Sequence, residues 1–318
     1  MTTSGTYVYT VNRDTIIRAA MLLVNKLEQS EVPTAQEVSD CSMFLNMLVK
    51  QWQGTADFAV GLKTWTRRHS YLFLNGTTGQ YFLNATTPGW CGAFTQTTLS
   101  INATAGATTI TPASIVGMVS GDIIGITVGA TIFWTTISSV ASPTITLSSG
   151  LPVNVGQGSI IFWYHTTAVA QQPLMIETCF LRDNQSNDVP IKFLTLEQYN
   201  LLPSKNNSTN VTDPSAIYYE WQLGSGVLYT DVAGCSDLSK YLCISYLEEI
   251  QDFNNPNDTP EYPQEYYLAL VHGLARLIAP MFNAPWSQVL EDNYKSSLAI
   301  AQNKHPPEES VLHFLTYE

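Results

Sequence analysis

Apolar residues recur at helical spacing near the start of the chain. After Asn12, a residue type suited to capping, the segment 13–27 carries Ile16, Ala20, Leu23 and Leu27 on one face. Pro33 then precedes Thr34, and Glu37 three residues later completes the pattern of a capping box. The following apolar stripe consists of Val38, Cys41, Leu45, Leu48 and Trp52. The pattern therefore predicts two antiparallel helices, the second ending at Gly54.

A second helical pattern lies between Pro263 and Pro280. Leucine, valine, isoleucine and alanine cover most of its circumference, which predicts a largely buried helix. His272 and Arg276 are four residues apart on the narrow remaining face. A histidine-based active site is one interpretation of this pair. The favoured one is a polar strip that faces a neighbouring chain or a loop carbonyl, because Gly273 permits close packing of another backbone.

The pattern changes in the middle of the chain. Between Arg68 and Glu177 the only charged side chain other than histidine is Asp122. Six short runs of β-branched and aromatic residues separated by turn residues predict strands between 97 and 165, and hence a small β-barrel or sandwich. A hairpin pairing 71–74 with 80–83 is expected to lead into it. Further strands and a short helix capped by Thr195 are expected after residue 173.

These patterns together predict an α+β fold with a helical core. Residues 1–65 and the C-terminal helices of 173–302 form this core, together with a mixed β region, and 66–172 is an inserted small β-barrel or sandwich. The residues 303–318 form a C-terminal arm in which Leu312, Phe314 and Leu315 are candidates for partner contact, since apolar residues follow Pro306 and Pro307.

Charge restricts the partners. The net charge is −12, and charged residues make up only 13% of the chain. From Leu247 to Glu318 there are eleven acidic and three basic residues, so this quarter carries 3 − 11 = −8. Such a chain is poorly suited to gripping nucleic acid, which requires Lys and Arg. Glu248, Glu249 and Asp252 form a small acidic cluster within this region.

Motifs of catalysis and cofactor binding are lacking. The sequence has no phosphate-binding glycine loop, no dinucleotide-binding motif and no zinc-protease motif. The five histidines are widely spaced, and the five cysteines contain no C-x-x-C pair. We therefore expect that the protein is not an enzyme and has no catalytic residue, cofactor or metal ion. Neither a signal peptide nor a membrane span is predicted.

Several segments, in order, resemble a known family. They are "RDTIIRAAMLLVNKL", "PTAQEVSDCSMFLNMLVKQWQ", "LTLEQYNLLPSK", "AIYYEWQL", "GVLYTDV", "ISYLEEIQDF" and "DTPEYPQEYYLALVHGLARLIAPMF". This order is similar to that of the head-to-tail adaptors of short-tailed bacteriophages, also called tail tubular protein A or packaged-DNA-stabilising protein. The resemblance covers about 1–65 and 175–302 and leaves the β module outside.

The resemblance implies a virion protein that is assembled in the host cytoplasm and lies at the head–tail junction. It implies a ring, usually of twelve copies, that binds the portal protein above and tail nozzle or tail fibre proteins below. DNA passes through during ejection without sequence-specific binding. In such a ring we expect acidic side chains to line the lumen, with Glu248, Glu249 and Asp252 as candidates.

Two other functions remain open at this stage. One is a virion or cell-surface protein that binds glycans, suggested by the Thr- and Asn-rich module with its Trp134 and Trp163. The other is a peptidoglycan hydrolase that uses Glu248 and Glu249 as a carboxylate pair.

Overall fold

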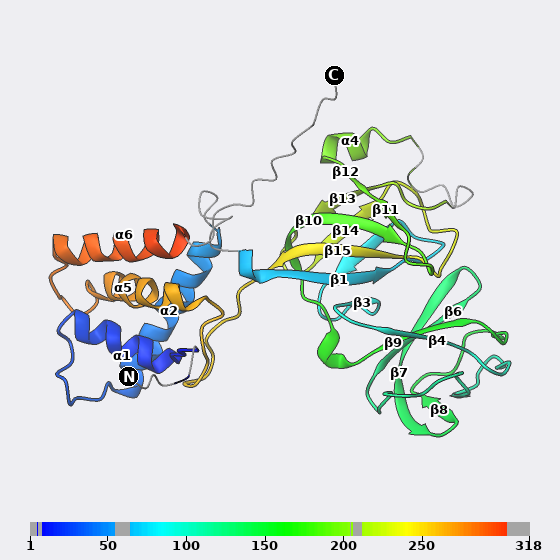
Figure 1. Ribbon diagram of the computed structural model, residues 1–318, viewed down its shortest axis with the longest axis horizontal. Helices are drawn as coiled ribbons and strands as arrows, with labels where there is room; N and C mark the ends of the chain where they lie inside the picture. The colour runs from blue at the N-terminus through cyan, green and yellow to red at the C-terminus, as the bar shows by residue number, and fades with distance from the viewer. Residues whose placement is uncertain (1–4, 6–7, 55–63, 204, 206–211, 304–318) are drawn as a thin grey trace. The chain divides into compact units, whose positions relative to one another are not determined.

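The protein consists of two compact units. The computed structural model describes residues 5, 8–54, 64–203, 205 and 212–303 (Figure 1). One unit, here called the helical unit, contains 1–66 and 250–318, and the other, the β unit, contains 67–249. Both ends of the chain therefore belong to the same unit, and the β unit lies between them in sequence.

The helical unit is arranged around one central helix. Its helices are α1 (Arg13–Leu23), α2 (Ala35–Gly54), α5 (Tyr267–Ile278) and α6 (Gln288–Asn303), with short 3-10 turns η2 (Thr64–Thr66) and η4 (Gln264–Tyr266). Helix α5 packs against α1, α2 and α6, so segments from both chain ends share one apolar core (Figure 1). Ile16, Leu45 and Leu274 are completely buried in it.

The predicted helix starts in this unit are confirmed. The Asn12 side chain accepts a hydrogen bond of 2.8 Å from the Thr15 backbone N–H at the start of α1. At the start of α2, the Glu37 N–H donates to the Thr34 hydroxyl and the Thr34 N–H donates to the Glu37 carboxylate, at 3.3 and 2.9 Å. The capping box therefore satisfies two backbone donors that the helix itself leaves unpaired.

Two sheets of the β unit pack face to face. One has the order β11-β10-β15-β1-β3 and is called sheet A here; the other has the order β12-β13-β14-β2 and is called sheet B. Their strands are β1 (Arg67–Phe73), β2 (Gln80–Leu83), β3 (Trp90–Cys91), β10 (Pro173–Arg182), β11 (Asp188–Pro190), β12 (Lys192–Phe193), β13 (Ala216–Glu220), β14 (Gly226–Thr230) and β15 (Tyr241–Glu248). Leu72 and Leu242 of sheet A share one core with Leu228 of sheet B. The short helix α4 (Leu196–Asn200), capped by Thr195 as predicted, contacts β13.

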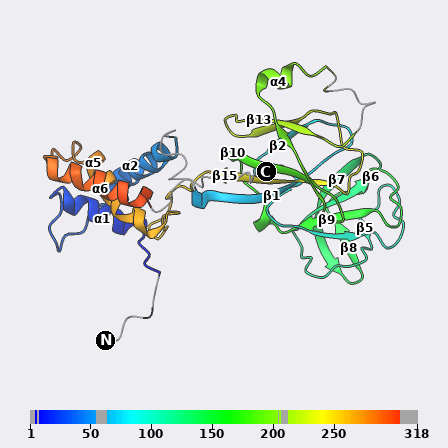
Figure 2. The same ribbon diagram turned by 45° about the horizontal axis from the view of Figure 1, so that its top comes forward.

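The third sheet forms a small barrel. Its order is β4-β9-β6-β7-β8-β5. The strands are β4 (Thr95–Thr98), β5 (Thr109–Ile110), β6 (Ile123–Val128), β7 (Thr131–Ala141), β8 (Thr144–Leu147) and β9 (Ile160–Tyr164), followed by the 3-10 turn η3 (Thr166–Ala168). Hydrogen bonds from Ala113 to Thr98 and from Ser100 to Thr111 join the chain next to its two edge strands, so the sheet curls back on itself (Figure 2). Its interior contains Ile124, Ile145 and Ile161, all completely buried.

An aromatic cluster connects the barrel to the outer face of sheet A. Phe73 of β1 packs with its ring centroid 4.3 Å from that of Phe162 in β9 and 4.9 Å from that of Phe94. Tyr241 of β15 contacts the same Phe94 ring at 5.0 Å. Because Leu72 faces sheet B while Phe73 faces the barrel, strand β1 is buried on both sides. This explains why the strand ends in three consecutive apolar residues, Tyr71, Leu72 and Phe73, after a polar first half.

The expectation of a helical core with an inserted β module is wrong. The three sheets form the β unit, 67–249, which is the larger of the two units, and the helical unit is built from the two flanking segments. The predicted hairpin of 71–74 with 80–83 is also absent: β1 pairs with β15 and β3, whereas β2 pairs with β14 in the other sheet. Helical periodicity in long segments dominated the prediction, and pairings between strands far apart in sequence leave no local signal.

Candidate functional site

His272, the first of the predicted contact residues, points into the helical unit. It is only 7% exposed on α5, and its Nδ1 atom has no hydrogen-bond partner among the described residues. Burial lowers the pKa of His272, because a charged imidazole would lose its hydration. Its role in contacting a partner remains a prediction.

Arg276 lies one turn further along α5 and is half exposed. Its Nε donates to the Glu291 carboxylate of α6 at 2.9 Å, and its guanidinium lies 5.4 Å from the centre of the Tyr294 ring. Glu291 also accepts from the Trp286 indole at 3.0 Å and lies 3.5 Å from Lys295. The indole hydrogen bond and then the two cations hold the pKa of Glu291 below its ordinary value. Arg276 therefore fastens α5 to α6 while its outer side faces solvent.

A groove runs beside this ion pair, where α2, α5 and α6 meet, and it encloses about 380 Å³. Its lining comprises Leu48, Gln51, Trp52, Gly273, Arg276, Leu277, Glu291, Tyr294, Lys295 and Leu298. Gly273 is required for this geometry, because a Cβ there would lie 2.9 Å from Leu48 Cδ2 and 3.3 Å from the Tyr294 ring. The floor of the groove is thus apolar, and its charged groups stand at the rim.

The predicted lumen residues are divided between the two units. Glu248, at the end of β15, accepts from the Arg68 Nε at 2.9 Å and is mostly buried. Asp252 belongs to the helical unit, where it lies 3.2 Å from the Lys50 ammonium and is half exposed. Glu249 is half buried and also has an interaction partner. Each carboxylate is therefore engaged locally, and their placement along a channel remains a prediction.

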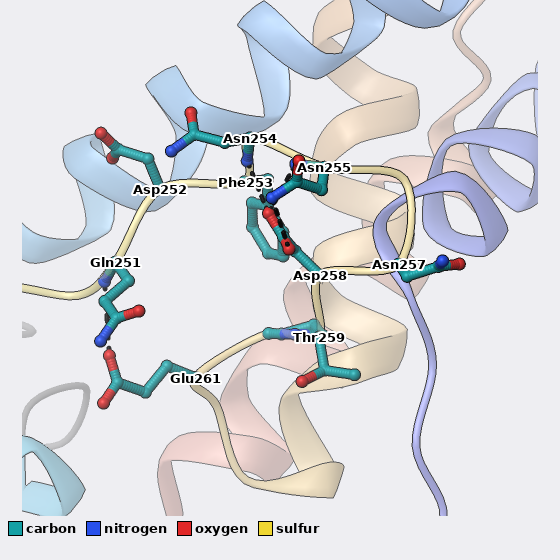
Figure 3. A pocket seen from close by; sticks show the side chains of 10 residues that line it. Gln251, Asp252, Phe253, Asn254, Asn255, Asn257, Asp258, Thr259 and Glu261 are labelled. Atoms are coloured by element: carbon teal, nitrogen blue, oxygen red, sulfur yellow. Dashed lines mark hydrogen bonds between the residues drawn. The ribbon is translucent and has the colours of Figure 1, made fainter.

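A loop from Gln251 to Glu261 surrounds a second space, of about 690 Å³ (Figure 3). Asp258 closes the loop by accepting from the backbone N–H groups of Asn254 and Asn255 at 2.8 and 2.6 Å. These bonds hold the pKa of Asp258 below its ordinary value. The Arg13 N–H donates to the Asp258 carbonyl at 2.8 Å, so the loop is tied to the start of α1. With the Asp258 carboxylate engaged in this way, the loop serves as a structural strap.

Two histidine pairs in the β unit were not found by the sequence analysis. His69 Nδ1 lies 2.8 Å from the Ser245 hydroxyl oxygen, but Ser245 is almost fully buried and poorly placed to attack a substrate. His165 Nδ1 lies 2.7 Å from Asp122, whose carboxylate also accepts from the Val119 N–H at 2.8 Å. Asp122 thus holds the turn before β6 and orients the imidazole. Asp122 is the only carboxylate between Arg68 and Glu177, and this was the sequence signal that could have indicated its structural role.

The two tryptophans that suggested glycan binding are engaged in packing. Trp163 is nearly fully buried within the barrel. Trp134 is half buried and covers two glycines: a Cβ at Gly125 would lie 2.6 Å from its ring, and one at Gly89 would lie 2.8 Å away. Both rings therefore take part in packing within the β unit.

The remaining observations concern metal sites, membrane-spanning helices and free thiols. Within the described residues, no cluster of three or more His, Cys, Asp or Glu side chains is suited to a metal ion. No helix of that part is both long and apolar enough to cross a bilayer. The five cysteines are buried free thiols. Leu312, Phe314 and Leu315 lie outside the described residues.

Comparisons with known proteins add little. No protein-family model matches the chain, and no curated protein matches it. The tailspike Gp54 of Acinetobacter baumannii bacteriophage AP22, solved in complex with A. baumannii capsular saccharide, is 16% identical over 22% of this chain, with a TM-score of 0.20. The chain spans 14% of that tailspike. VP17, a capsid protein of bacteriophage P23-77, is 11% identical over 58% of this chain and 82% of its own, with a TM-score of 0.12. At these TM-scores neither likeness carries an argument.

Proposed function

We propose that this protein is a structural head-to-tail adaptor of a bacteriophage virion, without catalytic activity. It assembles into a ring of about twelve copies, binds the portal protein and carries tail proteins, and DNA passes through its lumen. The observation that carries this proposal is the ordered resemblance of the chain to such adaptors. The resembling segments supply α1, α2, α5 and strands of sheets A and B, while the barrel lies outside them.

The charge of the chain supports passage of DNA rather than binding. Twelve copies at −12 would carry 12 × −12, or roughly −144, against one DNA charge per about 1.7 Å of duplex. A lumen lined with carboxylates repels phosphate along its length, so the duplex does not adhere during ejection. Asp252, half exposed beside Lys50, is the most accessible of the three lumen candidates.

In a closed ring of identical chains, each copy contacts its two neighbouring copies through two different surfaces. The helical unit carries two separate exposed apolar stripes. Met43 and Met47 lie four residues apart on α2, and Val289 and Ile300 lie eleven residues, about three turns, apart on α6. Each pair shares one side of its helix, as a lateral interface requires.

The mass of the assembly tests this function. We would measure it for the protein alone and mixed with the portal protein of the same virion, since an adaptor can require the portal as a template. We expect a complex with a fixed number of copies. A protein that stays monomeric in the presence of its portal would count decisively against the adaptor.

The interface has its own test. The variant M43D/M47D should form fewer complexes with the portal, because it places two charges in an apolar contact. The matched control is A35D/S39D, which adds the same charge at exposed positions of α2. Equal loss in both variants would show that charge alone, and not the methionine stripe, governs assembly.

A further inference from the structure

The groove between α2, α5 and α6 has the composition of a peptide-binding surface. Leu48, Trp52, Leu277 and Leu298 line it, and Gly273 lets the helices approach closely enough to form its floor. Grooves of this kind receive the apolar face of an amphipathic helix.

The rim of the groove indicates the charge of what it binds. Arg276 is 49% exposed and Lys295 is 64% exposed, whereas Glu291 between them is only 16% exposed. The accessible charge at the rim is therefore positive, although the chain as a whole carries −12. An apolar segment preceded by carboxylates is complementary to this surface.

The chain itself contains such a segment, beyond the end of α6. Fifteen residues follow Asn303, with the sequence KHPPEESVLHFLTYE. At helical spacing its four apolar residues share one side, and Glu308 stands one turn before them on the same side. These four residues are Val311, Leu312, Phe314 and Leu315. Glu308 would thereby face the cationic rim, and Glu309 would stand beside it, next to the apolar side.

The connection is long enough for the segment to return to its own groove. From Leu298 to Asn303 the helix rises about 7.5 Å, at about 1.5 Å per residue. The four residues 304–307, if extended, span up to about 13 Å, and Pro306 and Pro307 disfavour continuation of the helix.

We propose that the C-terminal segment 308–315 docks into the α2–α5–α6 groove of its own chain. The apolar residues cover the partly exposed Leu277 and Leu298, while Glu308 and Glu309 pair with Arg276 and Lys295. The docked segment shields an apolar surface in the free chain. This proposal does not depend on the adaptor function, so either can fail alone.

Disulfide trapping in the full chain tests the docking. The trap variant is L298C/L312C, and the matched control is A299C/L312C, whose helix cysteine is the next residue on the exposed side of α6. A flexible tether alone brings both pairs together at similar effective concentration. The five native cysteines are buried and compete little. Docking is expected to make the trap pair close about tenfold faster or more than the control, within a single chain.

Several outcomes decide the proposal. Equal closure rates in trap and control would overturn it, as would a disulfide that joins two chains. Replacing Lys295 by Glu in the trap background should slow closure several-fold, and an unchanged rate would refute the role assigned to charge. If L298C impairs folding, the pair L277C/L312C with the exposed control L268C/L312C on α5 decides by the same comparison.

Discussion

Phe73 connects the barrel to sheet A, and its removal tests whether the β unit unfolds as one body. The side chain is 3% exposed and contacts the rings of Phe94, Trp134, Phe162 and Tyr241 at centroid distances of 4.9, 5.5, 4.3 and 5.9 Å. Replacing a buried Phe by Ala costs about 3–5 kcal/mol, from lost transfer energy and the cavity that remains. Aromatic pairs add about 0.5–1.5 kcal/mol each, which places Phe73→Ala near the upper end, at about 5 kcal/mol.

The matched control is Phe82→Ala. Phe82 also lies in a strand, β2, but is 50% exposed, so we expect a loss of about 1 kcal/mol. Because a chain with two units has no single free energy of unfolding, the assay must separate them. Hydrogen exchange against urea, read by mass spectrometry for peptides of 67–249 apart from the helical unit, gives the value for the β unit alone. Peptides of the barrel and of sheet A should lose protection together.

Two results would refute this reasoning. One is a Phe73→Ala cost no larger than that of Phe82→Ala. The other is opening of the barrel peptides while those of β10 and β15 keep their full protection, because the barrel would then be an independent module.

Three further predictions concern single positions. Replacing His272 by Leu should raise the urea midpoint at pH 8, because it removes a buried unpaired nitrogen. Burial lowers the pKa of this imidazole, so the wild type loses stability as the pH falls below about 6.5 and the variant should not. An unchanged pH dependence of the urea midpoint would contradict this. The Thr34 hydrogen bonds, followed by Lys26, lower the pKa of Glu37 to about 2, so its stabilising effect is complete above about pH 4.5 and is lost as pH falls toward 2; helicity measured through acid titration should therefore depend less on pH in Glu37→Gln. Gly125→Ala should destabilise the β unit by about 1–3 kcal/mol because its Cβ would overlap the Trp134 ring, whereas Gly156→Ala, with open space around it, should change thermal stability by less than about 0.5 kcal/mol.

The site could be predicted only in part. The buried nature of α5 was readable from its apolar residues, and seven of its twelve residues, including His272, are buried. The interaction that Arg276 makes was not readable, because its partner Glu291 lies on α6, beyond a turn whose geometry the sequence pattern does not specify. The groove was missed for the same reason: its lining comes from three helices, and Gly273 gains its meaning only once Leu48 and Tyr294 lie opposite it.

The sequence by itself determined the local elements. Asn12, Thr34 and Thr195 cap helices because their side chains reach backbone N–H groups within three residues, and this chemistry needs nothing distant. The six short runs between 97 and 165 contain or adjoin the six strands of the barrel. Only the tertiary structure decided which strands pair. Strand β1 lies between β15 and β3 in sheet A, whereas β2 belongs to sheet B. The physical reason is that the pairings β1–β15 and β2–β14, and the packing of α1 and α2 against α5, join residues more than a hundred positions apart. The free energy of such contacts depends on surfaces that exist only after the chain has folded.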